Sequence, residues 1–262
     1  MKAEVVLTVA ESKRLIAKGV AALDFVRQRL KDGIVVVTAG STNGCIYEEL
    51  TGDVIDHRAY LTGCTTPAKG TPSWLSQPLA GLDDAKPERT VEALPDLVLV
   101  NGRPDPRLDR FSALDRMRAG DVYIKGATAL NYARGVAGIT IGHPRGGTIG
   151  GAIGTIIGMK LRLLIPVGLE KEVPFDIQEA AQRIAEPDEH LGHVHPLWPV
   201  RGTIFTEIEA LHVLCGVGAY PVAAGGVAGA EGGLRLLLHG NGEAVRQAVA
   251  LVQGIQGEPP LG

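Results

Sequence analysis

Three glycine-bearing segments carry the residue types that most often hold an anion. Glycine lets the backbone approach a ligand closely, and the free N–H groups at the start of a helix favour negative charge. Hydroxyl groups add neutral donors, while Lys125 and Arg145 add positive charge. The three segments therefore predict one binding site for a small anion. Its predicted ligand-binding residues are Gly40, Ser41, Thr42, Asn43, Lys125, Gly126, Thr128, Arg145, Gly146, Gly147 and Thr148.

Each segment taken alone has a simpler explanation, because tight strand-to-helix turns commonly use glycine. Three such segments together, two of them with a cation, favour a shared site. Their spacing matches neither the Gly-x-x-x-x-Gly-Lys-Ser/Thr loop of nucleotide hydrolases nor the Gly-x-Gly-x-x-Gly turn of dinucleotide-binding domains. Both of those classes are disfavoured, and we expect no cofactor.

Three side chains are candidates for catalysis. His143 lies just before the third segment, and histidine is the residue type that most often acts as a general base, so it is the preferred one, although a loop histidine bonded to backbone explains it equally well. Glu48 lies one turn into the helix that follows the first segment, where acidic side chains are usually just solvated. Cys45 lies near that helix's N-terminus, which favours a thiolate, but free cysteines commonly pack as small apolar groups.

A second polar cluster, Glu-His-x-x-His-x-His, contains His190, His193 and His195. Imidazoles this close together could share a metal ion. Their spacing on a proline-flanked loop fits no standard zinc site, however, so a polar loop is the simpler interpretation and no metal is assigned.

The elements expected to position these residues alternate between strand and helix. Thr8 and Glu11 have the spacing of a capping box, which predicts a helix start. The β-branched run 34–38 is typical of a strand buried on both faces of a parallel sheet. The alternation predicts a doubly wound α/β fold with a mainly parallel sheet, in which ligands bind beyond the carboxyl ends of the strands. Further strands are expected at 96–100, 121–124, 136–141 and 161–167, and helices at 108–117, 147–159 and 176–184.

The chain divides into two expected parts, an α/β domain over 1–190 and a small module over 200–262. The module has the order strand 201–205, helix, strand, strand, helix, which suggests an antiparallel α+β unit like half of a ferredoxin-like fold. Prolines interrupt the segment 53–95, which predicts a lid, a binding loop or an arm between domains.

Two stretches resemble a known superfamily. Residues 36–43 with the following Glu48-Glu49-Leu50 resemble the Gly-Ser-Thr phosphate loop of ribose-5-phosphate isomerases, and 125–130 is similar to their Lys-Gly loop. Residues 121–138 resemble a segment of the acyl-CoA transferases, which belong to the same superfamily as the sugar-phosphate isomerases. The resemblance covers about 34–170 and implies that Ser41, Thr42 and Lys125 contact a ligand anion. The acidic catalytic loop of the isomerases has no counterpart between Val100 and Lys125, so their chemistry does not carry over.

Together these features predict binding of a small phosphorylated or CoA-type metabolite, by an isomerase-like or transferase-like enzyme or by a non-catalytic sensing or assembly protein.

A net charge of -3 and a pI near 6.2 give no bulk attraction to nucleic acid or to anionic membranes. The start of the chain lacks the pattern of a secretory signal, so a cytoplasmic location is expected. Gly150, Gly154 and Gly158 share a helix face suited to close packing on the sheet or on a second subunit, and a homo-oligomer is expected.

Overall fold

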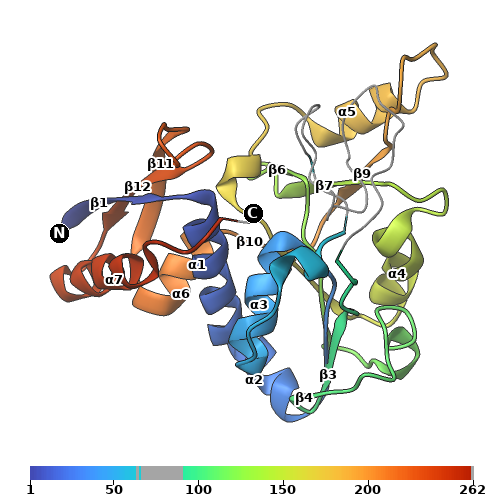
Figure 1. Cartoon of the computed structure of the whole chain (residues 1–262), viewed down its shortest axis with the longest axis horizontal. Helices are drawn as coiled ribbons and strands as arrows, with labels where there is room; N and C mark the ends of the chain where they lie inside the picture. Colours follow the sequence, from blue (N-terminus) through green and yellow to red (C-terminus); the bar gives the residue numbers. More distant parts are fainter. Residues whose placement is uncertain (63–64, 66–90, 261–262) are drawn as a thin grey trace.

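The protein has mixed α/β architecture. The computed structural model describes residues 1–62, 65 and 91–260, which contain seven α-helices and three β-sheets (Figure 1). Most of the predicted lid or arm at 53–95 lies outside the described residues. Within the described part, no helix combines the length and the apolar character needed to cross a membrane.

The central sheet has six strands in the order β10-β8-β5-β2-β3-β4. The first four strands in this order are parallel, the next pairs antiparallel with the fourth, and the last pairs antiparallel with the fifth, so the sheet is mixed. The buried β-branched run forms the strand predicted for it, with all four residues of β2 buried. The strands are β2 (Ile34–Val37), β3 (Leu97–Val100), β4 (Arg103–Pro104), β5 (Val122–Ile124), β8 (Arg162–Pro166) and β10 (Thr203–Phe205).

Helices lie on both sides of this sheet. Helices α1 (Val9–Ala22), α2 (Asp24–Lys31) and α3 (Ser41–Thr51) lie on one side, and α4 (Gly147–Gly158) lies on the other (Figure 1). The predicted capping box is present at Thr8, whose hydroxyl accepts from the Glu11 N–H while the Glu11 carboxylate accepts from the Thr8 N–H. The start of α1 was therefore readable from local chemistry.

The helix predicted over 108–117 does not form. These residues make turns and one short 3-10 helix, η2 (Leu114–Arg116). The Asp109 carboxylate accepts from the backbone N–H groups of Phe111 and Ser112 at 2.9 and 2.7 Å. Such local side-chain bonds compete with helical hydrogen bonds, which explains why the apolar spacing was misleading here.

The strand predicted at 136–141 exists but belongs to a different sheet. It is β7 (Val136–Thr140), which pairs antiparallel with β6 (Ala129–Asn131) and with β9 (Leu197–Val200). The third glycine segment therefore does not follow a strand of the parallel sheet, contrary to the prediction. Helix α5 (Ile177–Ile184) contacts this small sheet, and Asp176 is its N-cap, as predicted.

The tail contains an antiparallel sheet that includes the strands expected at 220–226 and 233–239 but not the one expected at 201–205. Its order is β1-β12-β11, with α6 (Glu207–Cys215) and α7 (Gly242–Ile255) packed nearby. The sheet recruits β1 (Lys2–Leu7), which was not predicted, beside β12 (Leu234–His239) and β11 (Gly218–Ala224). The strand expected at 201–205 is β10, which pairs with β8 instead. Two strand pairings, β1 with β12 and β10 with β8, thus join residues on opposite sides of the domain boundary expected near residues 190–200.

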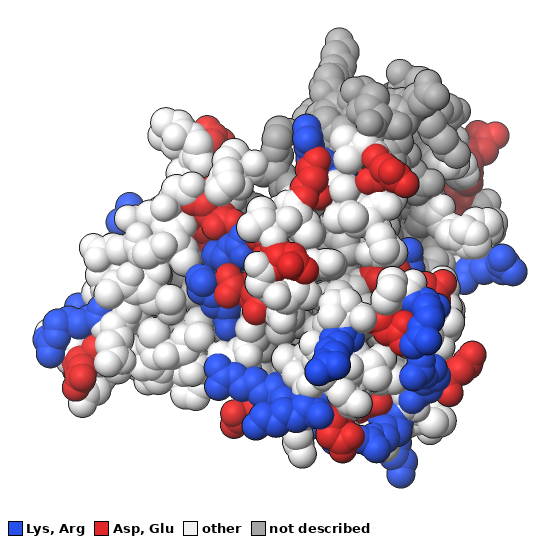
Figure 2. Space-filling model, turned by 60° about the horizontal axis from the view of Figure 1, so that its bottom comes forward, with Lys and Arg blue, Asp and Glu red and all other residues white. Residues whose placement is uncertain are grey.

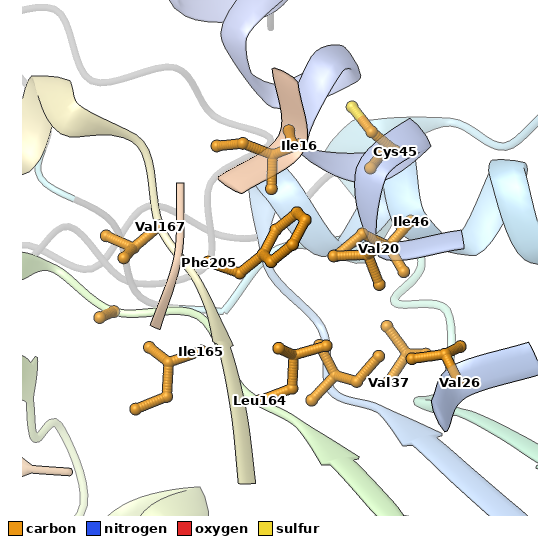
Figure 3. Close-up of a cluster of buried hydrophobic side chains, with 14 of the residues drawn as sticks. Ile16, Val20, Val26, Val37, Cys45, Ile46, Leu164, Ile165, Val167 and Phe205 are labelled. Atoms are coloured by element: carbon orange, nitrogen blue, oxygen red, sulfur yellow. The ribbon is translucent and has the colours of Figure 1, made fainter. Parts of the chain in front are cut away.

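One apolar core ties α1 to the sheet. Phe205 of β10 lies among Ile16 and Val20 of α1 and Leu164 of β8, all essentially without exposed surface (Figure 3). Gly19 permits the close approach of α1 to α6, because an added Cβ would lie 2.8 Å from both the Cα and the Cβ of Ala210. This packing fixes the ends of β8 and β10 relative to α1.

Charged side chains of both signs are interspersed on the face shown in Figure 2. Ion pairs among the described residues include Arg118 with Asp32 at 2.6 Å and Arg29 with Asp121 at 3.7 Å. This face therefore offers no large patch of a single sign.

Candidate functional site

The first two glycine segments meet around one cavity. Strands β2 and β5 are parallel neighbours, with Val37 opposite Ile124, so the turns that leave them emerge at the same edge of the sheet. The cavity between these turns has a volume of about 330 Å³. Its lining includes Gly40, Ser41, Thr42, Asn43, Lys125, Gly126 and Thr128 from the two segments, and Lys13, Thr62, Glu170 and Lys171 from elsewhere.

The first segment presents the uncapped start of a helix to this cavity. Gly40 is the N-cap of α3 and provides no side-chain capping bond. Asn43 holds the turn in place by donating from Nδ2 to the Thr38 carbonyl at 2.7 Å. Its Oδ1 is buried and has no hydrogen-bond partner among the described residues. The segment thus combines a positive helix end with small polar side chains.

Lys125 supplies the positive charge of the second segment. It is partly buried, and its ammonium donates to the Gly126 carbonyl at 3.1 Å. Burial, together with the neighbouring charges of Arg110 and Lys171, lowers the pKa of Lys125 to about 8. It makes no ion pair with a described carboxylate, so at neutral pH a charged ammonium lies in the cavity wall. An anion in the cavity would stabilise this charged form.

The third segment does not line the main cavity but borders a second one next to the 125–128 turn. A smaller cavity of about 200 Å³ shares Thr62, Lys125 and Thr128 with the main one, and is also lined by His143, Gly147 and Thr148. Arg145 and Gly146 line neither cavity, and Arg145 is exposed.

Local hydrogen bonds occupy the polar groups of the third segment. The Arg145 N–H donates to Nδ1 of His143 at 3.2 Å, which agrees with the simpler explanation of this histidine. Thr148 accepts from Arg110, whose guanidinium also pairs with Asp96 at 2.5 Å. His143 therefore faces the smaller cavity, while Thr148 is engaged by Arg110.

Glu48 lies outside both cavities, in an ion-pair cluster. Its carboxylate is 2.5 Å from the Arg14 guanidinium and 3.1 Å from Nε2 of His57. Burial raises the pKa of Glu48, but hydrogen bonds from Arg14 and from the Ile55 N–H outweigh it and keep the pKa below its usual value. Glu48 is therefore ionised and organises Arg14 rather than the anion cavity.

The Cys45 thiol is buried on α3 and borders a separate cavity of about 300 Å³ near the C-terminal residues 258–260. Burial raises its pKa to about 12 despite the opposing charge of Arg14. At neutral pH this sulfur is therefore a thiol, which is the state expected of a packed cysteine.

Sequence reasoning missed the acidic and basic groups contributed by two other strands. Glu170 and Lys171 lie in η3 (Leu169–Lys171), just after β8, and Glu207 begins α6, just after β10. Glu207 is completely buried. The signal that could have found them is the one used for the first two segments, namely the turn after each parallel strand. For Glu207 this signal is hidden, because residues 201–205 are expected in the tail module rather than in the parallel sheet.

The histidine cluster does not gather into a metal site. The rings of His193 and His195 pack edge to face with centroids 5.0 Å apart, and His190 is bonded to the Gly192 carbonyl. Within the described parts of the chain, no group of three or more His, Cys, Asp or Glu side chains is placed to hold a metal ion.

No family model matches this chain, and neither does any curated protein or solved structure. The resemblance to sugar-phosphate isomerases and acyl-CoA transferases therefore rests on the sequence segments alone. A function has to be argued from the cavity itself.

Proposed function

We propose that the protein binds a small anionic metabolite, phosphorylated or CoA-type, in the cavity between the 40–43 and 125–128 turns. The observation that carries this proposal is the Lys125 ammonium, which is partly buried in the cavity wall without a described carboxylate partner. Placing a cation there costs desolvation energy that an anionic ligand would offset. A structural lysine would instead be expected to pair with an acid or to reach solvent.

The rest of the lining suits the same kind of ligand. Lys13 and Lys171 add two more amino groups, and Ser41, Thr62 and Thr128 add hydroxyl donors. The start of α3 adds a favourable dipole. A volume of about 330 Å³ is at the small end of the range for ligand sites, which favours a small metabolite or the charged end of a larger one.

The proposed activity is that of an isomerase-like or acyl-CoA transferase-like enzyme, with Ser41, Thr42 and Lys125 contacting the anion as the sequence resemblance implies. The finer fold description, a doubly wound arrangement, is part of this proposal. So is assembly into a homo-oligomer, for which the open space around Gly154 and Gly158 on α4 leaves room.

The alternative is a sensing or assembly protein that binds the anion without transforming it. One observation favours it: neither Glu48 nor Cys45 lines the main cavity, and His143 lines only the smaller one. The two functions differ in turnover. An enzyme converts the bound metabolite, whereas a sensor returns it unchanged after hours of incubation.

Thermal unfolding in the presence of inorganic phosphate, ribose phosphates and CoA esters tests the proposal. A ligand at 100 times its Kd should stabilise the protein by about 2.7 kcal/mol. Lys125→Gln should weaken binding about 10- to 100-fold, because it removes a hydrogen bond to a charged group. Lys31→Gln, at an exposed position on α2, is the matched control and should bind as the unaltered protein does. Absence of binding to every probe, or equal binding by both variants, would refute the anion site.

A further inference from the structure

A second cavity adjoins the proposed anion site. This side cavity is the one of about 300 Å³ that the Cys45 thiol borders. Val9, Lys13 and Ser41 line both the side cavity and the main cavity, in whose wall Lys125 lies. An anion held at the start of α3, where Ser41 is the first residue, therefore lies next to the side cavity.

Residues 258–260 form one wall of the side cavity. Two hydrogen bonds hold this segment against α1. The Gly257 N–H donates to the Glu11 carboxylate at 2.9 Å, and the Arg14 guanidinium donates to Glu258 at 2.6 Å. Residues 259 and 260 are both prolines, which lack a backbone N–H, so this part of the wall presents ring carbons and no hydrogen-bond donor.

The rest of the side cavity is mainly apolar or already engaged. Ala10 adds a methyl group from α1, and Cys45 adds a neutral thiol because burial raises its pKa. The two charged or titratable groups at the far side have partners, since the His57 ring is 3.1 Å from Glu48 and Glu258 is paired with Arg14. The side cavity thus offers apolar surface beside a main cavity that offers positive charge and hydroxyl groups.

We propose that the ligand of this protein is an amphiphilic anion, whose charged group binds in the main cavity while an apolar ring or chain attached to it fills the side cavity. This inference rests on the proposed function and narrows its ligand to organic phosphates with an apolar substituent. A sugar or polyol phosphate suits the side cavity less well, because its hydroxyl groups would lose hydrogen bonds to water beside the proline rings. An apolar substituent gains affinity from the same burial.

The dimensions agree with a ligand of two parts. An apolar cavity of about 150 Å³ holds a benzene molecule. A side cavity of about 300 Å³ therefore has room for one ring or a short chain, and the main cavity then receives only the charged end. Burial of roughly 60–110 Å² of apolar surface corresponds to a gain in affinity of about 10- to 100-fold.

Two phosphate monoesters with the same charged group test the inference by calorimetry on the full chain. Phenyl phosphate carries a ring, and glycerol 3-phosphate carries a hydroxylated chain. Phenyl phosphate should bind about 10- to 100-fold more tightly. Inorganic phosphate measures the anion site alone. If inorganic phosphate binds but the two esters bind equally, the inference is overturned and the proposed function stands. If none of the three binds, both are refuted.

Variants of the side cavity locate the source of this preference. Ala10 lines the side cavity but not the main one, so Ala10→Phe should fill it. The preference for phenyl phosphate should then fall to about twofold or less, because the ring loses its apolar contacts, while inorganic phosphate binds as before. Ala250→Phe, at an exposed position on α7, is the matched control and should keep the preference. The double variant Pro259→Ser, Pro260→Ser removes the apolar wall without adding bulk and should also reduce it. A preference that survives in both side-cavity variants would overturn the inference.

NMR of the phenyl phosphate complex locates the ring directly. Nuclear Overhauser effects between the ring protons and the Ala10 methyl group are expected, because this methyl group borders the side cavity alone. Leu61 borders only the main cavity. Contacts of the ring with Leu61 and none with Ala10 would place it beside the charged group and contradict the proposed arrangement.

Discussion

Replacing the buried Glu207 with glutamine should change how the stability of the protein depends on pH. Burial and the charge of Glu170 raise the pKa of this carboxyl from 4.5 to about 7. A raised pKa means that the unfolded chain releases the proton at lower pH than the folded protein does. The contribution of this carboxyl group to the unfolding free energy is therefore largest below about pH 4.5 and decreases as the pH rises toward 7. The difference between the two pKa values corresponds to about 3 kcal/mol at most.

Glutamine has nearly the same shape and cannot ionise, so Glu207→Gln should remove this loss. Its carbonyl can still accept from the Leu169 N–H, as the carboxylate does at 3.0 Å. We expect the two proteins to have similar stability near pH 4.5 and the variant to be more stable at pH 8 by up to about 3 kcal/mol. For a chain of this size that corresponds to a rise in Tm of roughly 6–12 °C.

Urea and thermal unfolding at several pH values between about 4.5 and 8 measure this difference. Titration of other buried groups, such as Asp96, affects both proteins equally and cancels in the comparison. Glu243→Gln on the exposed face of α7 serves as the control and should keep the pH dependence of the unaltered protein. Parallel stability curves for the unaltered protein and Glu207→Gln across this range would refute the reasoning.

Two further predictions concern packing and thiol chemistry. Gly19→Ala should cost about 1–3 kcal/mol of unfolding free energy, because its Cβ would lie 2.8 Å from atoms of Ala210 and Phe205. Gly154 lies on an exposed part of α4, and a Cβ added there would have nothing within 4 Å, so Gly154→Ala should instead raise the unfolding free energy by about 0.5–1 kcal/mol. Urea unfolding measures both variants, and equal changes in their unfolding free energy would contradict the packing argument. Cys45, with its pKa raised to about 12, should react with iodoacetamide at pH 8 at least about 100-fold more slowly than a free thiol. Peptide mass spectrometry measures this rate, and labelling of the native protein at the free-thiol rate would be incompatible with the burial of that sulfur.

Elements that depend on neighbouring residues were predictable from the sequence. The capping box of Thr8 and Glu11 requires only a spacing of three residues, and the strand at 34–37 requires only a continuous apolar run. The meeting of the 40–43 and 125–128 turns was also predictable, because the carboxyl ends of adjacent parallel strands lie at one edge of a sheet.

The same local reasoning was wrong where a competing interaction carried no periodic signal. The apolar spacing of 108–117 is helical, yet hydrogen bonds to the Asp109 carboxylate fold that stretch into turns. For Cys45 the alternative of a packed cysteine agrees with the structure, because burial raises its pKa although it lies near the start of a helix.

The sequence by itself determined the class of fold, most of the helices and two of the turns that form the cavity, because caps, hydrophobic runs and glycine turns act over a few residues. Only the tertiary structure decided that Lys2 pairs with His239, that β10 joins β8, and that the Leu169 N–H donates to the buried Glu207 carboxylate. Those contacts join distant parts of the chain and depend on which strand edges remain free once the core has packed. The charge states of the buried acids follow from that packing, since burial and neighbouring charges set a pKa.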